Sequence, residues 1–116
     1  MDSVRLVVDL LTEALSVPVF SDMPRNRPAR CVTVDLDGDS STPYLLLPRI
    51  ALTCWGTSDS NAHGIALSAV EALRDAAIDH PYLSSVQLES MSRDEWGNTG
   101  QGRYLVILEL VINVDD

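Results

Sequence analysis

The chain lacks lysine altogether. Its 116 residues include 8 basic residues, all of them arginine, and 17 acidic residues. A nucleic-acid-binding surface needs clustered cations, so the formal net charge of -9 argues against a protein that grips DNA or RNA. This acidity instead favours solubility and repels phosphate. The one basic cluster, Arg25, Arg27 and Arg30, is either a loop that binds a partner or a solvated loop held by Pro24 and Pro28.

Long apolar runs are also missing. No run reaches the ~20 residues that a membrane-spanning helix needs, and Glu109 interrupts the longest one. Cysteine is scarce, with Cys31 and Cys54 both in strand-like runs. No signal peptide is evident at the amino end, so we expect a reducing compartment and two buried thiols, the alternative being a disulfide between neighbouring strands. These features predict a soluble protein with no membrane partner.

The sequence has no motif typical of catalysis or cofactor binding. It contains no phosphate-binding glycine loop, no GxGxxG after a strand, no HExxH and no CxxC. His63 and His80 lie about 17 positions apart on one predicted helix, roughly 25 Å at 1.5 Å per residue, so they do not share a metal. Ser90 and Ser92 have neither a histidine near them in sequence nor a nucleophile elbow around them. We therefore expect no catalytic residue, no metal, no cofactor and no enzymatic activity.

The most informative segment that is present runs from Tyr104 to Val114. One side of this extended segment is wholly apolar, with Tyr104, Val106, Leu108, Leu110, Ile112 and Val114. The other side is nearly so, with Leu105, Ile107, Glu109, Val111 and Asn113. A strand that faces water on one side alternates strictly, so we expect both faces to be covered, one by helices and the other by another subunit. The pattern does not decide which face is which.

Two amphipathic helices flank the other predicted strands. Ser3 is expected to cap a first helix that runs to about Ser16. Pro18 ends it, and the short extended segment around Pro18 is either a sheet edge or a bare connection. A second helix, from about Asp59 or Ser60 to Ile78, has an unbroken apolar stripe rich in alanine and ends at His80-Pro81. The predicted strands and connections are a Pro- and Arg-rich loop 21–30, a strand 31–36, a turn 37–39, a strand 49–55 with a lead-in at 45–47, a strand around 86–90 and a polar loop 92–102.

This order predicts one domain over residues 1–116 with an α+β fold. Local hairpins make the sheet mainly antiparallel, with four to five strands, and both helices pack on one face in a two-layer sandwich. Such an arrangement leaves the second sheet face without a helix. The final strand, which is apolar on both sides, therefore points toward assembly.

Two further groups of residues attract attention. Asp35, Asp37 and Asp39 have the spacing that opens a calcium-binding loop, but Gly38 is at the wrong position and no glutamate follows at the twelfth, so we interpret them as a charged strand end and turn. Trp55, at a strand end, belongs either to the core or to a subunit interface. Trp96, in a glycine-rich loop, either packs locally or anchors a partner.

The order of these features resembles a known family. A short leading helix, the segment Val17 to Arg30 and the hairpin around Asp37-Gly38 precede a strand ending Leu52-Thr-Cys-Trp-Gly-Thr-Ser58, which leads into an alanine-rich helix. This order resembles the tail terminator (tail completion, head-to-tail joining) proteins of long-tailed phages, particularly those of actinobacterial phages and prophages. The block from Pro48 to Leu73 carries most of the likeness.

The resemblance implies a structural virion protein of the tail or neck, assembled in the host cytoplasm. Such a protein forms a homo-oligomeric ring, expected to be a hexamer, that caps the tail tube, docks a head-completion or connector protein and lets DNA pass without specific binding. The alternatives are a small acidic binding module, such as an antitoxin or a DNA-mimic inhibitor, and another neck or tail-tube protein of the same virion. From parity and loop placement, the expected interface residues are Arg25, Arg27, Arg30, Trp55, Trp96, Leu105, Ile107, Glu109 and Val111. Those expected at a lumen or acidic turn are Asp35, Asp37 and Asp39.

Overall fold

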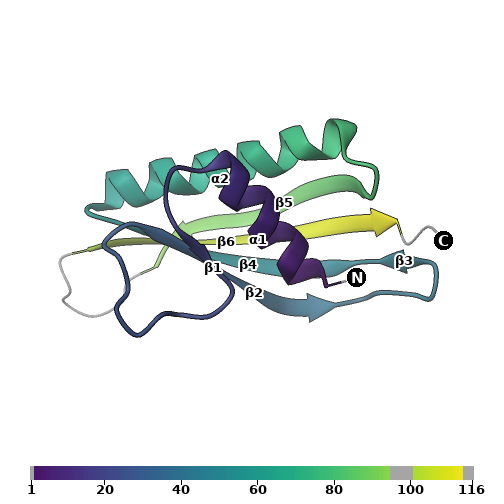
Figure 1. The fold of residues 1–116 in the computed structure, drawn as a ribbon, viewed down its shortest axis with the longest axis horizontal. Coiled ribbons are helices and arrows are strands. Elements are labelled where there is room, and N and C mark those ends of the chain that lie inside the picture. Colours follow the sequence, from purple (N-terminus) through teal and green to yellow (C-terminus); the bar gives the residue numbers. More distant parts are fainter. Residues whose placement is uncertain (1, 95–100, 114–116) are drawn as a thin grey trace.

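The computed structural model describes residues 2–94 and 101–113 as a helical layer packed on one six-stranded sheet (Figure 1). The helices are α1 (Ser3–Ala14) and α2 (Asp59–Asp79). The strands are β1 (Val19–Phe20), β2 (Cys31–Asp39), β3 (Leu45–Leu46), β4 (Pro48–Gly56), β5 (Leu83–Arg93) and β6 (Gly102–Asn113). The predicted two-layer α+β sandwich is confirmed. The sheet has six strands rather than the four to five predicted, because β1 and β3, of two residues each, are counted as strands.

Strand β6 occupies the middle of the sheet, with antiparallel neighbours β4 and β5. Strand β2 pairs antiparallel with β4, and β1 lies parallel to β2 at the edge, which is one of the two alternatives predicted for the segment around Pro18. The short strand β3 continues β4 along β6, because Leu45 opposite Asn113 and Arg49 opposite Glu109 belong to the same register. The β2–β4 hairpin therefore extends far along the sheet, and its turn lies at the opposite end of the molecule from loop 21–30 (Figure 1).

Helix α2 begins where the sequence pattern places it. Its N-cap is Ser58, whose hydroxyl accepts a hydrogen bond from the Asn61 backbone N–H at 3.1 Å. The predicted stripe faces the sheet, and its buried members are Ala62, Ile65, Ala66, Ala69, Val70 and Leu73. The helix start lies directly on Gly56 and Gly102, which are paired across β4 and β6. An ideal Cβ on Gly102 would lie 2.0 Å from the Ser58 carbonyl oxygen, so glycine is required there.

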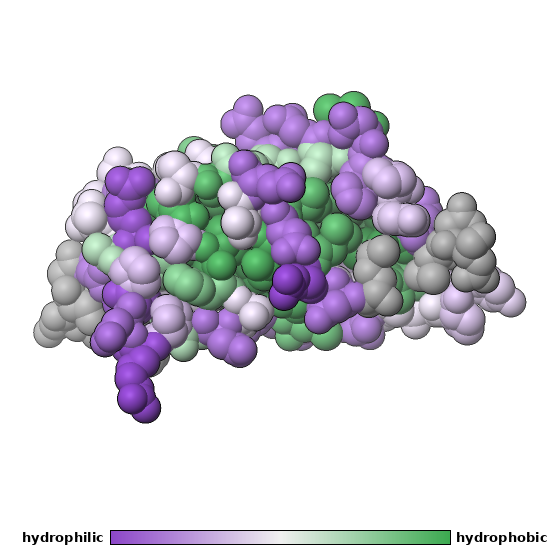
Figure 2. Space-filling view, viewed as in Figure 1, coloured by the Kyte–Doolittle hydropathy of each residue, from purple (hydrophilic) through white to green (hydrophobic). Residues whose placement is uncertain are grey.

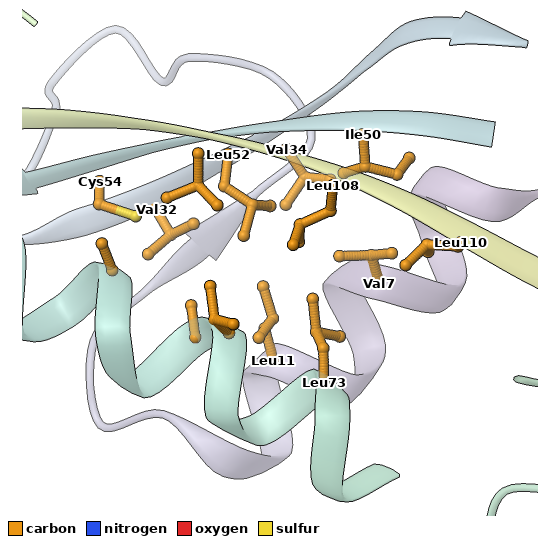
Figure 3. Close-up of a cluster of buried hydrophobic side chains, with 14 of the residues drawn as sticks. Val7, Leu11, Val32, Val34, Ile50, Leu52, Cys54, Leu73, Leu108 and Leu110 are labelled. Carbon is orange, nitrogen blue, oxygen red and sulfur yellow. The ribbon is translucent and has the colours of Figure 1, made fainter. Parts of the chain in front are cut away.

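The core lies between the helices and the sheet (Figure 3). Val7 and Leu11 of α1 and Leu73 of α2 contribute to the same apolar cluster as the sheet residues. From β6, the cluster contains Val106, Leu108, Leu110 and Ile112, each at most 1% exposed. The wholly apolar face of the final strand is thus the one that the helices cover, and the Leu105 side points away from them.

Helix α1 starts one residue earlier and ends two residues sooner than predicted. The cap is Asp2 rather than Ser3, because the Asp2 carboxylate accepts a hydrogen bond from the Arg5 backbone N–H at 3.1 Å. The helix ends at Ala14 rather than Ser16, and Leu15 already has an extended backbone. This early end brings Val17, which is 8% exposed, into the core.

The predicted turn at Asp37-Gly38-Asp39 is wrong, because β2 continues through all three residues. Pairing shifts between Leu36 and Gly38, so Asp37 is the extra residue of a β-bulge. Glycine and a short polar side chain suit a bulge as well as a turn, which explains the ambiguity. The chain reverses further along, where the Thr42 N–H donates to the Leu45 carbonyl at 2.8 Å. Tyr44, at this turn, is 80% exposed.

The second hairpin is longer than the sequence indicated. Strand β5 extends to Arg93 and β6 starts at Gly102, so the predicted loop 92–102 loses two residues at its start and one at its end to the strands. The Asp94 N–H also donates to the Arg103 carbonyl at 2.8 Å. Trp96 and Val114 lie outside the described residues. Neither of the two described helices combines the length and apolar character needed to cross a membrane.

Candidate functional site

The candidate site is the sheet face opposite the helices, which we call the outer face. Its side chains alternate with those of the core along the three long inner strands. The outer face consists of Cys31, Thr33 and Asp35 from β2, Arg49, Ala51, Thr53 and Trp55 from β4, and Arg103, Leu105, Ile107, Glu109 and Val111 from β6. Five of the predicted interface residues therefore share one surface, namely Trp55, Leu105, Ile107, Glu109 and Val111.

The centre of the outer face is neutral and made of small or branched side chains. Thr33 and Thr53 are paired across β2 and β4, and Ala51 is paired with Ile107 across β4 and β6. Close packing within the sheet leaves Ile107 only 9% exposed, whereas Leu105 and Val111 are half-buried. The accessible apolar surface that the sequence predicted is thus mainly that of Leu105 and Val111.

Two arginines cover Trp55 at one end of the outer face. The Cζ atoms of Arg27 and Arg103 lie over the Trp55 ring at 3.9 and 4.7 Å from its centroid, within the range of a cation–π contact. Arg27 also donates to the Gln101 side chain at 2.6 Å, and Gln101 donates to the Ala29 carbonyl. Loop 21–30 is therefore tied onto the sheet, which rules out a wholly solvated loop at Arg27. Trp55 itself is 5% exposed, so this chain already buries it.

Arg27→Ala should uncover Trp55. Loss of a partly buried cation–π contact and its hydrogen bond is expected to lower the free energy of unfolding by about 1–2 kcal/mol. Exposure of the indole should shift its fluorescence emission to longer wavelength, measured in a Trp96→Phe background that leaves Trp55 as the only tryptophan. Arg25→Ala is the matched control and should change neither quantity. Equal emission spectra for the two variants would contradict this role of Arg27.

Acidic side chains gather at the other end of the outer face, around Arg49. The Arg49 guanidinium binds Asp37 through Nε at 2.9 Å and Glu89 through a terminal nitrogen at 2.9 Å. Glu109 is directly opposite Arg49 in the β4–β6 register. The neighbouring Glu109 carboxyl group raises the pKa of Glu89, and the positive charge of Arg49 opposes this shift. We call Asp37, Glu89 and Glu109 the acidic cluster.

The other charged residues that the sequence singled out are two aspartates on β2 and two arginines in loop 21–30, toward opposite ends of the molecule (Figure 1). Asp39 is at the hairpin, where hydrogen bonds from the Ser41 side chain and backbone N–H lower its pKa. Asp35 is exposed on β2. Arg25 and Arg30 are exposed in the loop that Arg27 ties down, and within residues 2–94 and 101–113 neither has an ion-pair partner.

The two cysteines and His63 also have defined places in the structure. Cys31 and Cys54 are free and buried, as predicted. Burial raises the pKa of the Cys54 thiol to about 12 and raises that of Cys31, where nearby Arg27 acts in the opposite direction. His63 stacks on Tyr104 with ring centroids 4.8 Å apart. In the part of the chain that the structure describes, no three His, Cys, Asp or Glu residues are grouped to hold a metal ion.

The fold has a counterpart among solved structures. A chain in the virion of a native gene transfer agent particle aligns with 97% of this chain and 86% of its own length, at a TM-score of 0.59 and 14% sequence identity. The two chains share a fold. No protein-family model and no curated protein sequence matches this chain. The similarity to the gene transfer agent protein is thus one of backbone arrangement over almost the whole of this chain.

Sequence reasoning missed the partners that organise the two ends of the outer face. Arg103, Arg49 and Glu89 were not singled out, although each contacts a residue that was. The available signal was strand register: aligning the two predicted strands so that Arg49 faces Glu109 would have revealed an opposite-charge pair. No local signal connects Arg27 with Trp55, because a long stretch of chain separates them.

Proposed function

We propose that this chain is a non-catalytic structural protein of a phage-like virion that forms a ring of six copies at the end of the tail tube. In this role it stops tail polymerisation and offers a docking face to a head-completion or connector protein. The observation that carries the proposal is the shared fold with a chain of a gene transfer agent virion over 97% of this chain. The family resemblance of the segment Pro48 to Leu73 supports the more specific station at the tail terminus.

Two physical properties support the same role. Leu105 and Val111 are half-buried on the outer face, and both described helices pack on the opposite side of the sheet, which suits a contact with a neighbouring subunit. The net charge of -9 suits a channel through which DNA slides without sticking, because carboxylates repel phosphates. A ring built from one chain needs two different contact patches on each copy, one for each neighbour.

The proposal is tested by deleting the gene from the genome that encodes this chain and imaging the particles by electron microscopy. We expect tails of excess length and heads that are not joined to them, because nothing then ends tube growth. A plasmid copy of the wild-type gene should restore normal particles. Tails of normal length joined to heads would overturn the terminator role, and normal-length tails without heads would favour another protein of the neck.

A further inference from the structure

The two ends of the molecule carry opposite and unbalanced charge. At one end, Arg25 and Arg30 are exposed, and among the described residues no carboxylate pairs with either. At the other end, the acidic cluster of Asp37, Glu89 and Glu109 shares the single guanidinium of Arg49. Two exposed cations at one end thus have no ion-pair partner among the described residues, and at the other end three carboxylates gather around one cation, in a chain where acidic residues outnumber basic ones.

These two groups cannot neutralise each other within one copy. Trp55, which anchors the arginine loop, and Arg49, which anchors the acidic cluster, lie six residues apart on β4. At about 3.3 Å per residue this spacing is roughly 20 Å, several times the reach of an ion pair. The loop and the hairpin also extend away from each other along the long axis of the molecule (Figure 1). Figure 2 shows the loop side as a strongly hydrophilic projection at the lower left.

The acidic end is also hollowed. A depression of about 230 Å³ lies there, with Asp39, Arg49, Glu109, Leu47 and Val111 in its lining. It joins carboxylates to aliphatic side chains, which is the surface that an arginine prefers, since its stem packs on apolar groups while its guanidinium binds carboxylates. The half-buried Val111, a predicted interface residue, forms part of this lining.

We propose that Arg25 and Arg30 of one copy dock on the acidic cluster and its adjoining depression on a second copy of this chain. The occupant is a second copy because the complementary charges are both present on this one sequence and are too far apart to meet within it. Each copy then uses its loop toward one neighbour and its outer-face depression toward the other. Such a heterologous contact repeats around a ring, so the inference rests on the proposed function and specifies its interface.

The inference is tested with two charge-reversed variants of the full chain. The loop-reversed variant is Arg25→Glu with Arg30→Glu, and the cluster-reversed variant is Glu89→Lys with Glu109→Lys. Self-association, measured by sedimentation velocity and light scattering over a concentration series, should weaken by about 100-fold or more in each, since two charge-assisted contacts are lost. Arg74→Glu, on the helical layer, reverses another exposed arginine without a described partner and should change association less than about threefold.

Mixing the two reversed variants provides the sharpest result. The acidic loop of one then meets the basic cluster of the other, and the unaltered loop meets the unaltered cluster, so assemblies of alternating chains should form although neither variant assembles alone. Thermal unfolding of each variant establishes that it is folded before mixing. If the cluster-reversed variant does not fold, Glu89→Gln with Glu109→Gln replaces it and should weaken association by about tenfold.

The outcomes separate this inference from the proposed function. Association of the loop-reversed variant at wild-type strength, or a wild-type chain that stays monomeric throughout, overturns the interface, while the gene deletion still decides the tail role. Unaltered particles after gene deletion overturn the tail role, whatever the charge reversal shows. The wild-type assembly should also weaken between about 0.1 M and about 1 M salt, where the Debye length falls from about 10 to about 3 Å.

Discussion

Gly102→Ala should destabilise the native state by about 3 kcal/mol or more, at the upper end of the usual cost of overpacking. The added methyl would lie 2.0 Å from the Ser58 carbonyl oxygen and 2.5 Å from the Asp59 nitrogen. Both are backbone atoms at the N-terminus of α2, so no side-chain rotation relieves the clash. Either the helix start moves off the sheet or the beginning of β6 does. The midpoint of urea unfolding measures the loss.

Gly64→Ala is the matched control for that substitution. Gly64 lies inside α2 and is exposed, and an added Cβ meets nothing within 4 Å. Because glycine is about 1 kcal/mol less favourable than alanine in a helix interior, this variant should gain about 0.5–1 kcal/mol. The same substitution should thus lower the free energy of unfolding at Gly102 and raise it at Gly64. Equal urea midpoints for the two variants would show that α2 does not rest on the glycine pair.

Leu108→Asp is expected to unfold the chain, whereas Val111→Asp should leave it folded and prevent its assembly. Leu108 is fully buried among helix and sheet side chains, and an unpaired carboxylate there costs at least about 4 kcal/mol, a large fraction of the 5–15 kcal/mol typical of a domain. Val111 is half-buried on the outer face, where an aspartate keeps contact with water. Circular dichroism reports folding, and light scattering reports mass.

The pair also tests the assignment of the two sides of β6. Ile107→Asp is a less discriminating variant than Val111→Asp, because the 9% exposure of Ile107 means that a charge there also disturbs the sheet. A Val111→Asp chain that retains wild-type mass and stability would count against the outer face as a subunit interface. A folded Leu108→Asp chain would count against the core assignment.

Long periodic segments were predictable because each encodes its environment locally. The α2 stripe and the alternation along β6 both reflect one face packed on the core, and both were found from spacing alone. The predicted turn at Asp37-Gly38 was wrong because bulges and turns favour the same residue types. Only the pairing of Gly38 with Arg49 across the two strands distinguishes them. The prediction of Ser3 as the cap of α1 was wrong because Asp2 and Ser3 are equally suitable by residue type. Only the hydrogen bond from the Arg5 N–H to Asp2 distinguishes them.

The candidate site was predictable only in part, for a related reason. Alternation along the final strand was enough to place Leu105, Ile107, Glu109 and Val111 on one face, because this prediction does not depend on the rest of the fold. Contacts between distant segments could not be found in this way. The guanidinium of Arg27 reaches Trp55 and Gln101 only after three separate segments have been brought together by the sheet.

The central position of β6 has a consequence for how the protein acquires its structure. This strand follows the other five described strands in the sequence, yet among the described residues β4 and β5 are joined only through it. A growing chain that has not reached Gly102 therefore carries two unpaired strand edges, one of them on β4, which is rich in apolar side chains. Closure of the sheet has to wait for distant segments to meet, which makes folding slow relative to helical proteins of this size. Premature termination before β6 consequently yields an aggregation-prone fragment rather than a smaller folded domain.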